Sequence, residues 1–159
     1  VPTSRHIVIR PIQTAWREFL RPLYQRPPAF QVAALCYHGH GENRRVLLIT
    51  SRGTGRWVLP KGWPIDGLDA PAAAAQEAWE EAGVRPASIK PRAVGRFDYM
   101  KRLNEGLEIP VEAKVYKIKV ADLAETFPEA GTRERRWVTA NDAANMVAEP
   151  GLREILKAF

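Results

Sequence analysis

Short apolar runs alternate along the chain with polar stretches that contain glycine or proline, a pattern typical of strands joined by turns. The polar letters HGEN separate the first two apolar runs and predict a β-hairpin. Strands are expected at residues 31–39, 44–52, 57–59, 87–102, 111–120 and 133–140. Within 111–120 the apolar positions change parity near Tyr116, which predicts either a bulge or a sheet covered on both faces.

One helix is predicted in the middle of the chain, from Asp69 as N-cap to a left-handed stop at Gly83. Its pattern places Trp79 on the face opposite the glutamates, with Ala72, Ala75 and Ala82, and predicts Trp79 as a core anchor. Two more helices are expected near the end, one capped by Thr139 or Asn141 and one at 152–159 beyond Pro150. This order predicts an α/β fold in which helices sandwich a mixed sheet.

The chain has 159 residues, enough for one domain with a substantial core. We assign residues 1–29 to an N-terminal arm or short helix and residues 30–159 to the folded domain. No apolar run approaches the roughly 18 residues that span a bilayer, so no membrane partner is expected. The single cysteine, Cys36, cannot form an internal disulfide, which favours a reducing compartment such as the cytoplasm.

The net charge is +6, yet three acidic residues gather in the predicted central helix. A basic protein with a local acidic cluster points to a polyanionic partner and a metal ion that bridges the like charges. The basic residues are spread along the chain, and no nucleic-acid-binding motif accompanies them. A polyphosphorylated small molecule is therefore favoured over nucleic acid, and a homodimer is left open.

Glu77, Glu80 and Glu81 share one face of that helix, because each residue advances about 100°. Like charges one turn apart destabilise a helix, and carboxylates near its C-terminus oppose the dipole. A hard divalent cation such as Mg²⁺ would offset both effects, since it prefers oxygen ligands. The alternative interpretation is a solvated acidic face.

Residues 62–84 read Gly62, five residues, Leu68, seven residues, then QEAWEEAGV, which resembles the Nudix box. The strand order resembles the Nudix α/β/α sandwich over roughly residues 30–159. Two positions depart from the family pattern: Gln76 replaces arginine, and Leu68 replaces the first glutamate. Gln76 can donate a hydrogen bond to Glu80 without bringing charge. Asp66 and Asp69 are candidates to supply the missing carboxylate.

The resemblance implies an enzyme that hydrolyses a diphosphate linkage with water as nucleophile and Mg²⁺, or alternatively Mn²⁺, as cofactor. It implies that Glu77 and Glu81 are metal ligands and that Glu80 is a third ligand or a relay, all three being catalytic. The Gly62 carbonyl would complete the metal shell. Candidates for the general base outside the box are Glu105, Glu108 and Glu112.

The stretches Ser51-Arg52 and WVLPKG resemble the branch with diphosphoinositol polyphosphate and diadenosine polyphosphate phosphohydrolases. The segments FPE at 127–129 and RWV at 136–138 resemble it too. The resemblance implies substrate contacts from Ser51, Arg52, Lys61, Trp63 and Arg136, with Arg133 and Arg135 as further candidates. Gln31 stands where some of these relatives carry arginine, which weakens the inositol interpretation. Aromatic residues that could stack on a nucleobase are Tyr37, Trp63, Phe97 and Tyr99.

The leading hypothesis is therefore a metal-dependent pyrophosphohydrolase of a highly phosphorylated small molecule, either a diphosphoinositol or a diadenosine polyphosphate. A second hypothesis keeps the fold and changes the substrate to ADP-ribose, a sugar nucleotide or capped RNA. A third is a Nudix-fold nucleotide sensor with weak or lost turnover, for which the two departures in the box are the support.

Overall fold

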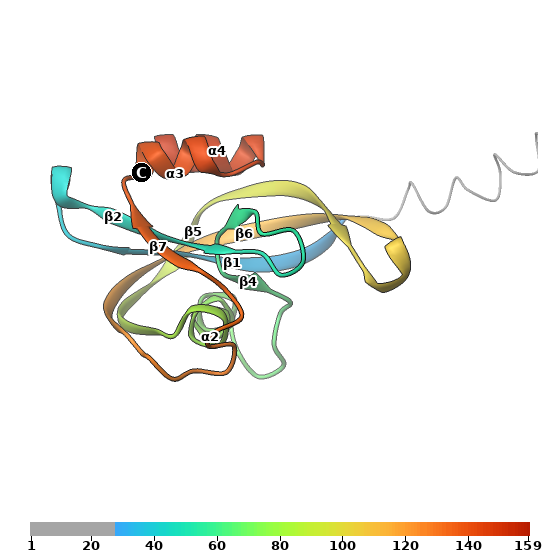
Figure 1. Ribbon diagram of the computed structural model, residues 1–159, viewed down its shortest axis with the longest axis horizontal. Helices are drawn as coiled ribbons and strands as arrows, with labels where there is room; N and C mark the ends of the chain where they lie inside the picture. The colour runs from blue at the N-terminus through green and yellow to red at the C-terminus, as the bar shows by residue number, and fades with distance from the viewer. Residues whose placement is uncertain (1–27) are drawn as a thin grey trace, which may run out of the picture.

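A computed structural model describes residues 28–159, so the predicted N-terminal arm lies almost wholly outside the described residues. The described chain forms three layers, with a mixed sheet between helix α2 on one side and helices α3 and α4 on the other (Figure 1). This arrangement confirms the predicted α/β sandwich. None of the helices in residues 28–159 has the length and hydropathy needed to cross a bilayer.

The sheet has seven strands in the order β3-β2-β1-β6-β5, with β4 added to β1 and β7 added to β2. Strand β1 pairs with β6 in parallel, and the other pairings are antiparallel. The bounds are β1 Ala29–His38, β2 Arg45–Thr50, β3 Trp57–Val58, β4 Lys61–Gly62, β5 Val84–Arg102, β6 Glu108–Leu123 and β7 Arg135–Val138. Short 3-10 turns, η1 Gly41–Asn43 and η2 Asn104–Gly106, close two of the connections.

Strand β4 and the full length of β5 were not predicted. Strand β4 is two residues long, and its loop is rich in proline and glycine, so no periodicity marks it. Strand β5 begins directly after the helix stop and crosses several register shifts against β6, which hide its alternation. Of the two alternatives for 111–120, the sheet covered on both faces explains the change of parity, because the two faces carry separate cores. Strand β6 pairs with β1 in unbroken register, and the extra residues of the shifts near Tyr116 lie in β5.

The sheet is covered on both faces, and β6 shows how the sequence encodes this. Its odd positions Val111, Ala113 and Val115 belong to the core under α3 and α4. Its later even positions, including Tyr116 and Ile118, belong to the core under α2. The change of parity thus marks where the buried side chains of β6 change from the α3–α4 face of the sheet to the α2 face.

Helix α2 spans Ala70–Ala82 and begins and ends as predicted. The Asp69 carboxylate accepts a hydrogen bond from the Ala72 N–H at 2.9 Å, and Gly83 adopts a left-handed φ of 68°. A Cβ at Gly83 would also overlap the Phe127 ring. Since Asp69 is engaged as the N-cap, it does not replace the carboxylate that Leu68 lacks.

The prediction that Trp79 anchors the core is wrong. The buried positions of α2 are Ala73, Ala74, Ala78 and Ala82, whose small side chains let the helix pack closely on β1 and β6. Trp79 is half-exposed and lies beside Leu68 and Ile89 at an apolar hollow on the surface. The glutamate face accordingly borders the sheet instead of pointing away from it.

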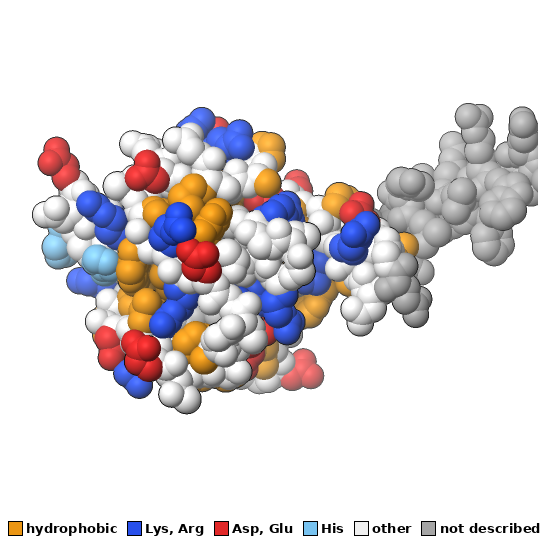
Figure 2. Space-filling model, viewed as in Figure 1, with side chains coloured by type: hydrophobic (Ala, Val, Ile, Leu, Met, Phe, Trp, Pro, Cys, Tyr) orange, Lys and Arg blue, Asp and Glu red, His pale blue; other side chains and the backbone are white. Residues whose placement is uncertain are grey.

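The C-terminal helices are α3, Ala140–Met146, and α4, Pro150–Lys157. Thr139 is the N-cap of α3, since its hydroxyl accepts from the Asp142 N–H at 3.1 Å. Helix α4 begins at Pro150 itself, two residues earlier than predicted, because proline suits the first turn of a helix. Figure 2 shows that Lys and Arg side chains on the face in view are interspersed with acidic and hydrophobic ones, without forming one continuous field.

Candidate functional site

The centre of the site is the junction of α2 with β4, where Glu77 meets the main chain of Gly62. A Cβ atom at Gly62 would overlap the Glu77 carboxylate, so any side chain there would displace that carboxylate from its present position. Gly62 is in turn held by its pairing with Val32 of β1. The helix and the sheet thus bring a carboxylate and a main-chain segment that are fifteen positions apart into direct proximity.

Glu81, one turn further along α2, is held on both carboxylate oxygens. Its Oε2 accepts from the Lys61 N–H at 3.0 Å, and its Oε1 accepts from Arg133 Nη2 at 2.7 Å. Its side chain is 13% exposed. Glu81 is therefore a largely buried carboxylate, paired on both oxygens, that connects α2 to Lys61 and to Arg133.

Glu80 is turned toward its own helix. Its Oε1 accepts from Gln76 Nε2 at 2.8 Å, which is the hydrogen bond predicted for the glutamine that replaces arginine. The bond orients Glu80 but leaves its charge uncompensated, because an amide is neutral.

Arg133, which the sequence indicated only as a phosphate contact, is instead a buried partner of the carboxylates. Its side chain is 7% exposed and pairs with Glu81 and with Glu129, the latter at 3.0 Å. Its Nη1 also donates to the Thr50 carbonyl at 3.1 Å. The guanidinium that the box lacks at Gln76 is thus supplied from the segment before β7.

Burial and neighbouring negative charge raise the pKa of Glu77, and burial raises the pKa of Glu81. Burial raises the pKa of Glu77 to about 7, and the carboxylates of Glu81, Glu80 and Glu129 raise it further. Burial also raises the pKa of Glu81, against which Arg133 and the Lys61 N–H act. A cation would relieve this repulsion, since it interacts favourably with every carboxylate in the group.

The donor set fits a hard divalent cation, because it consists of carboxylate oxygens and a glycine main chain. In the arrangement described, the three glutamates face different partners. Within residues 28–159 no three Asp, Glu, His or Cys side chains stand together as a preformed ligand cluster. Joint ligation by Glu77, Glu80 and Glu81 therefore requires rotation of their side chains and release of Glu81 by Arg133.

Two of the proposed substrate residues lie on the loop between β2 and β3. The Ser51 hydroxyl is 2.6 Å from that of Thr54 and accepts from the Arg56 N–H, so it shapes the loop. Arg52 is exposed and pairs with Glu129 at 3.2 Å. Arg52 thus continues the ion-pair chain that runs through Glu129 to the carboxylates.

Lys61 connects the carboxylates to the opposite face of the sheet. Its main-chain N–H holds Glu81, while its ammonium lies 5.3 Å from the centre of the Tyr99 ring. Burial lowers the pKa of Lys61 to about 8, against the attraction of Glu81 and Glu149. The half-buried Lys61 side chain is therefore a cation beside the Tyr99 ring.

The remaining basic and aromatic candidates lie apart from the carboxylates. Trp63 is 40% exposed, with the Lys101 ammonium 5.5 Å from its ring centre. Arg136 lies over the Trp57 ring and pairs with Glu134. Arg135 donates to the carbonyls of Ala82 and Ala124, so it closes the C-terminal end of α2.

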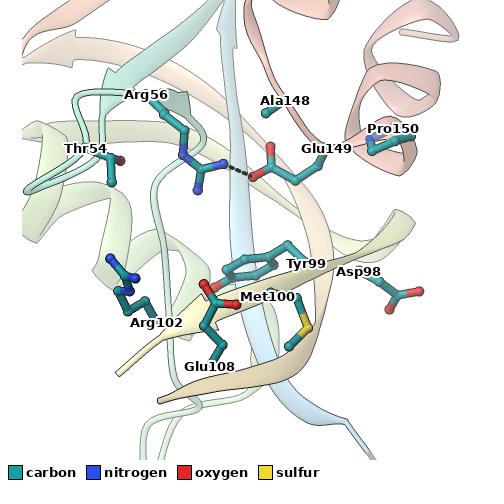
Figure 3. A pocket seen from close by; sticks show the side chains of 10 residues that line it. All are labelled: Thr54, Arg56, Asp98, Tyr99, Met100, Arg102, Glu108, Ala148, Glu149 and Pro150. Atoms are coloured by element: carbon teal, nitrogen blue, oxygen red, sulfur yellow. Dashed lines mark ion pairs between the residues drawn. The ribbon is translucent and has the colours of Figure 1, made fainter. Parts of the chain in front are cut away.

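A cavity of about 540 Å³ opens on the α3–α4 side of the sheet (Figure 3). Its walls come from the β2–β3 loop, β5, β6 and the start of α4. Its lining combines five charged residues with apolar and aromatic ones: Arg56, Asp98, Arg102, Glu108 and Glu149 beside Thr54, Tyr99, Met100, Ala148 and Pro150. Neither Glu149 nor Arg56 was among the predicted site residues, because neither was assigned to a motif.

Two of the three candidates for the general base can be placed. Glu108 is exposed and lines this cavity. Glu112 is paired with Arg96 across the β5–β6 ribbon at 3.3 Å. The side chain of Glu105 is not among those described.

Comparison with known proteins agrees with this architecture. The model of the NUDIX domain matches residues 29–159. Nudix hydrolase 21, chloroplastic, of Arabidopsis thaliana is 32% identical over 124 residues, which cover 77% of this chain and 59% of that protein. Diphosphoinositol polyphosphate phosphohydrolase 2 of Rattus norvegicus is 25% identical over 74% of this chain and 62% of its own length. The chain thus spans less than two thirds of these relatives.

Among solved structures, the Ap4A hydrolase of C. elegans in a binary complex superposes with a TM-score of 0.58. It is 19% identical, and the match covers 81% of this chain and 93% of that one. At this identity the likeness concerns the fold. With the domain match over nearly all described residues and the box helix in place, the chain belongs to the Nudix family.

Proposed function

We propose that this protein is a metal-dependent pyrophosphohydrolase that cleaves a diphosphate linkage in a highly phosphorylated small molecule. The observation that carries the proposal is the meeting of Glu77 with Gly62 beside the Lys61–Glu81 hydrogen bond. The approach of a helix carboxylate to the main chain of the loop supports a shared metal site at this junction. The family match and the relatives named above support the same reaction class.

Mg²⁺, or Mn²⁺ in its place, would be held by Glu77, Glu80, Glu81 and the Gly62 carbonyl, and would neutralise phosphate charge and acidify water. Lys61 and Arg52 would bind the phosphates, Lys61 as a point charge and Arg52 as a fork. Water adds to one phosphorus, the bridging P–O bond breaks, and the water proton passes to a carboxylate. Glu108 is the described base candidate that borders the cavity.

Diphosphoinositol and diadenosine polyphosphates remain the proposed substrates, with ADP-ribose, sugar nucleotides and capped RNA as alternatives. The cytoplasm is retained as the proposed compartment on the strength of the one cysteine, although one relative named above is chloroplastic. Cys36 is buried, and burial raises the pKa of its thiol, as expected for a packing residue.

The test is turnover of diadenosine pentaphosphate and hexaphosphate, diphosphoinositol pentakisphosphate, ADP-ribose and capped RNA with Mg²⁺, Mn²⁺ or EDTA. Metal-dependent phosphate or nucleotide release by the wild type, retained in Glu125→Gln and lost in Glu81→Gln, is the expected result. Glu125 is a matched control because it is an exposed glutamate outside the site. Folded protein that binds a substrate without cleaving it would overturn the proposal in favour of the sensor.

A further inference from the structure

Arg133, the cation among the carboxylates, binds three acceptors through three different nitrogens. Its Nη2 donates to Glu81 Oε1 at 2.7 Å, its Nε to Glu129 Oε2 at 3.0 Å, and its Nη1 to the Thr50 carbonyl at 3.1 Å. The side chain is 7% exposed. The guanidinium therefore stays anchored at two points when the contact with Glu81 is broken.

The other groups around the box glutamates supply no comparable charge. Within residues 28–159, no other Lys or Arg side chain forms an ion pair with a glutamate of α2. Lys61 reaches Glu81 with its main-chain N–H, and the partner of Glu80 is the neutral amide of Gln76. Arg133 is thus the cation that is paired with this helix in the described chain.

The proposed divalent cation and Arg133 need the same carboxylate. Both oxygens of Glu81 are already engaged, Oε1 by the guanidinium and Oε2 by the Lys61 N–H. Two cations on one side of a carboxylate also repel each other, and the repulsion is weakly screened at a nearly buried site. The guanidinium and the divalent cation are therefore alternative partners of Glu81.

Competition and positioning predict opposite effects of removing Arg133. If Arg133 held Glu81 in the orientation that a cation needs, its removal would weaken cation binding. If Arg133 competes, its removal strengthens cation binding, because no ion pair has to be broken. Breaking the pair also leaves nearly buried N–H groups without that acceptor, which is unfavourable. The engagement of both Glu81 oxygens favours competition.

We infer that Arg133 is an internal competitor of the divalent cation at Glu81. On cation binding the Glu81 carboxylate leaves Nη2, while the guanidinium remains on Glu129 and on the Thr50 carbonyl. The inference rests on the proposed function for the existence of the cation site. It assigns control of cation affinity to a residue outside the box, 52 positions from Glu81 in the chain.

The experiment is Mn²⁺ binding to the protein without substrate, measured as free Mn²⁺ by electron paramagnetic resonance. Arg133→Met should bind Mn²⁺ about tenfold to a hundredfold more tightly than the wild type, the usual value of a hydrogen bond to a charged group. Arg52→Met is the matched control, because it removes a positive charge from Glu129 without a contact to Glu81. Its dissociation constant should stay within about threefold of the wild type, since Arg52 is exposed and its charge is screened.

A measurement on the wild type applies even if Arg133→Met does not fold. In NMR spectra of nitrogen-labelled protein, saturating Mg²⁺ should remove the exchange protection of the Arg133 Nη2 protons, which donate to Glu81. Protection of the Nε proton, which donates to Glu129, should remain. The signals are assigned by their loss in Arg133→Lys.

Equal or weaker Mn²⁺ binding by Arg133→Met, or the same gain in Arg52→Met, would overturn the inference. Unchanged protection of the Nη2 protons at saturating Mg²⁺ would overturn it too. Absence of Mn²⁺ binding by the wild type and by both variants would refute the cation site itself, and with it the proposed function. Failure of the inference alone is therefore distinguishable from failure of the proposed function.

Discussion

Glu81, which is largely buried, and Glu149, which is buried, have different surroundings. Glu81, on the α2 side, is paired on both oxygens, to Arg133 and to the Lys61 N–H. Glu149, on the α3–α4 side, has one long ion pair and one oxygen without a partner in the described chain. The difference shows that burial alone does not reveal a role, since an acceptor with partners contributes to stability whereas one without a partner costs free energy.

The largest expected effect is a loss of turnover on substitution of Glu81, the carboxylate that is paired on both oxygens. Glu81→Gln should lower kcat by about 10² to 10⁴, the usual range when a positioned catalytic carboxylate is removed. Initial rates with Mg²⁺ and diadenosine hexaphosphate measure this loss, and Glu125→Gln is the control variant. A variant that retains more than about a tenth of the wild-type rate would contradict the assigned role.

Among the substitutions considered, removal of the Arg133 guanidinium should lower the free energy of unfolding most. Arg133→Met leaves Glu81 without its cation and Glu129 with Arg52 alone, and loss of one partner of a buried pair typically costs about 3–5 kcal/mol. Urea denaturation measures the loss, and Arg136→Met is the control, because its exposed pair is worth less than about 1 kcal/mol. Millimolar Mg²⁺ should restore more stability to Arg133→Met than to the wild type.

An unfolding free energy unchanged by Arg133→Met would mean that the ion pairs contribute nothing. The carboxylate network would then not explain how the protein tolerates Gln76.

Stability of the metal-free protein should depend on pH through Glu77. Its pKa is about 7 in the folded protein and near 4.5 unfolded, so the unfolded chain releases this proton first. The stabilising contribution of the protonated group is complete below about 4.5 and is lost as pH rises through about 7. Thermal melts in EDTA measure the slope, which Glu77→Gln should flatten between these values.

The smallest expected effect is on the unfolding free energy when Glu149, which has one oxygen without a partner in the described chain, is substituted. Glu149→Met should leave the unfolding free energy within about 1 kcal/mol of the wild type or raise it, because an apolar side chain replaces a poorly paired buried charge. Thermal and urea melts measure it. A loss above about 2 kcal/mol would show that Glu149 is structural, and the contrast with Glu81 would disappear.

Prediction from sequence succeeded where local rules act. The N-cap at Asp69, the left-handed stop at Gly83 and the Gln76–Glu80 hydrogen bond all depend on residues within one or two helical turns. The prediction for Trp79 was wrong because the face of α2 that becomes buried depends on how the helix packs on the sheet. The close approach of α2 to the sheet selects alanines for the contact, and periodicity does not encode that distance.

The functional region shows the same division. The box predicted Gly62 and the glutamates as one unit, and the structure brings Glu77 and Glu81 to the β4 segment. It did not predict that Arg133 pairs with Glu81, because the two residues are 52 positions apart. Glu149 had no motif at all, and its importance comes only from its burial beside Arg56 and Tyr99.

By itself, the sequence determined the order of the longer strands and of the helices, the boundaries of α2 and the spacing that identifies the box, since these depend on neighbouring residues and fixed helical geometry. Only the tertiary structure decided which carboxylates are satisfied. Pairing and desolvation depend on through-space distances between segments that the sheet brings together, and no local pattern specifies them.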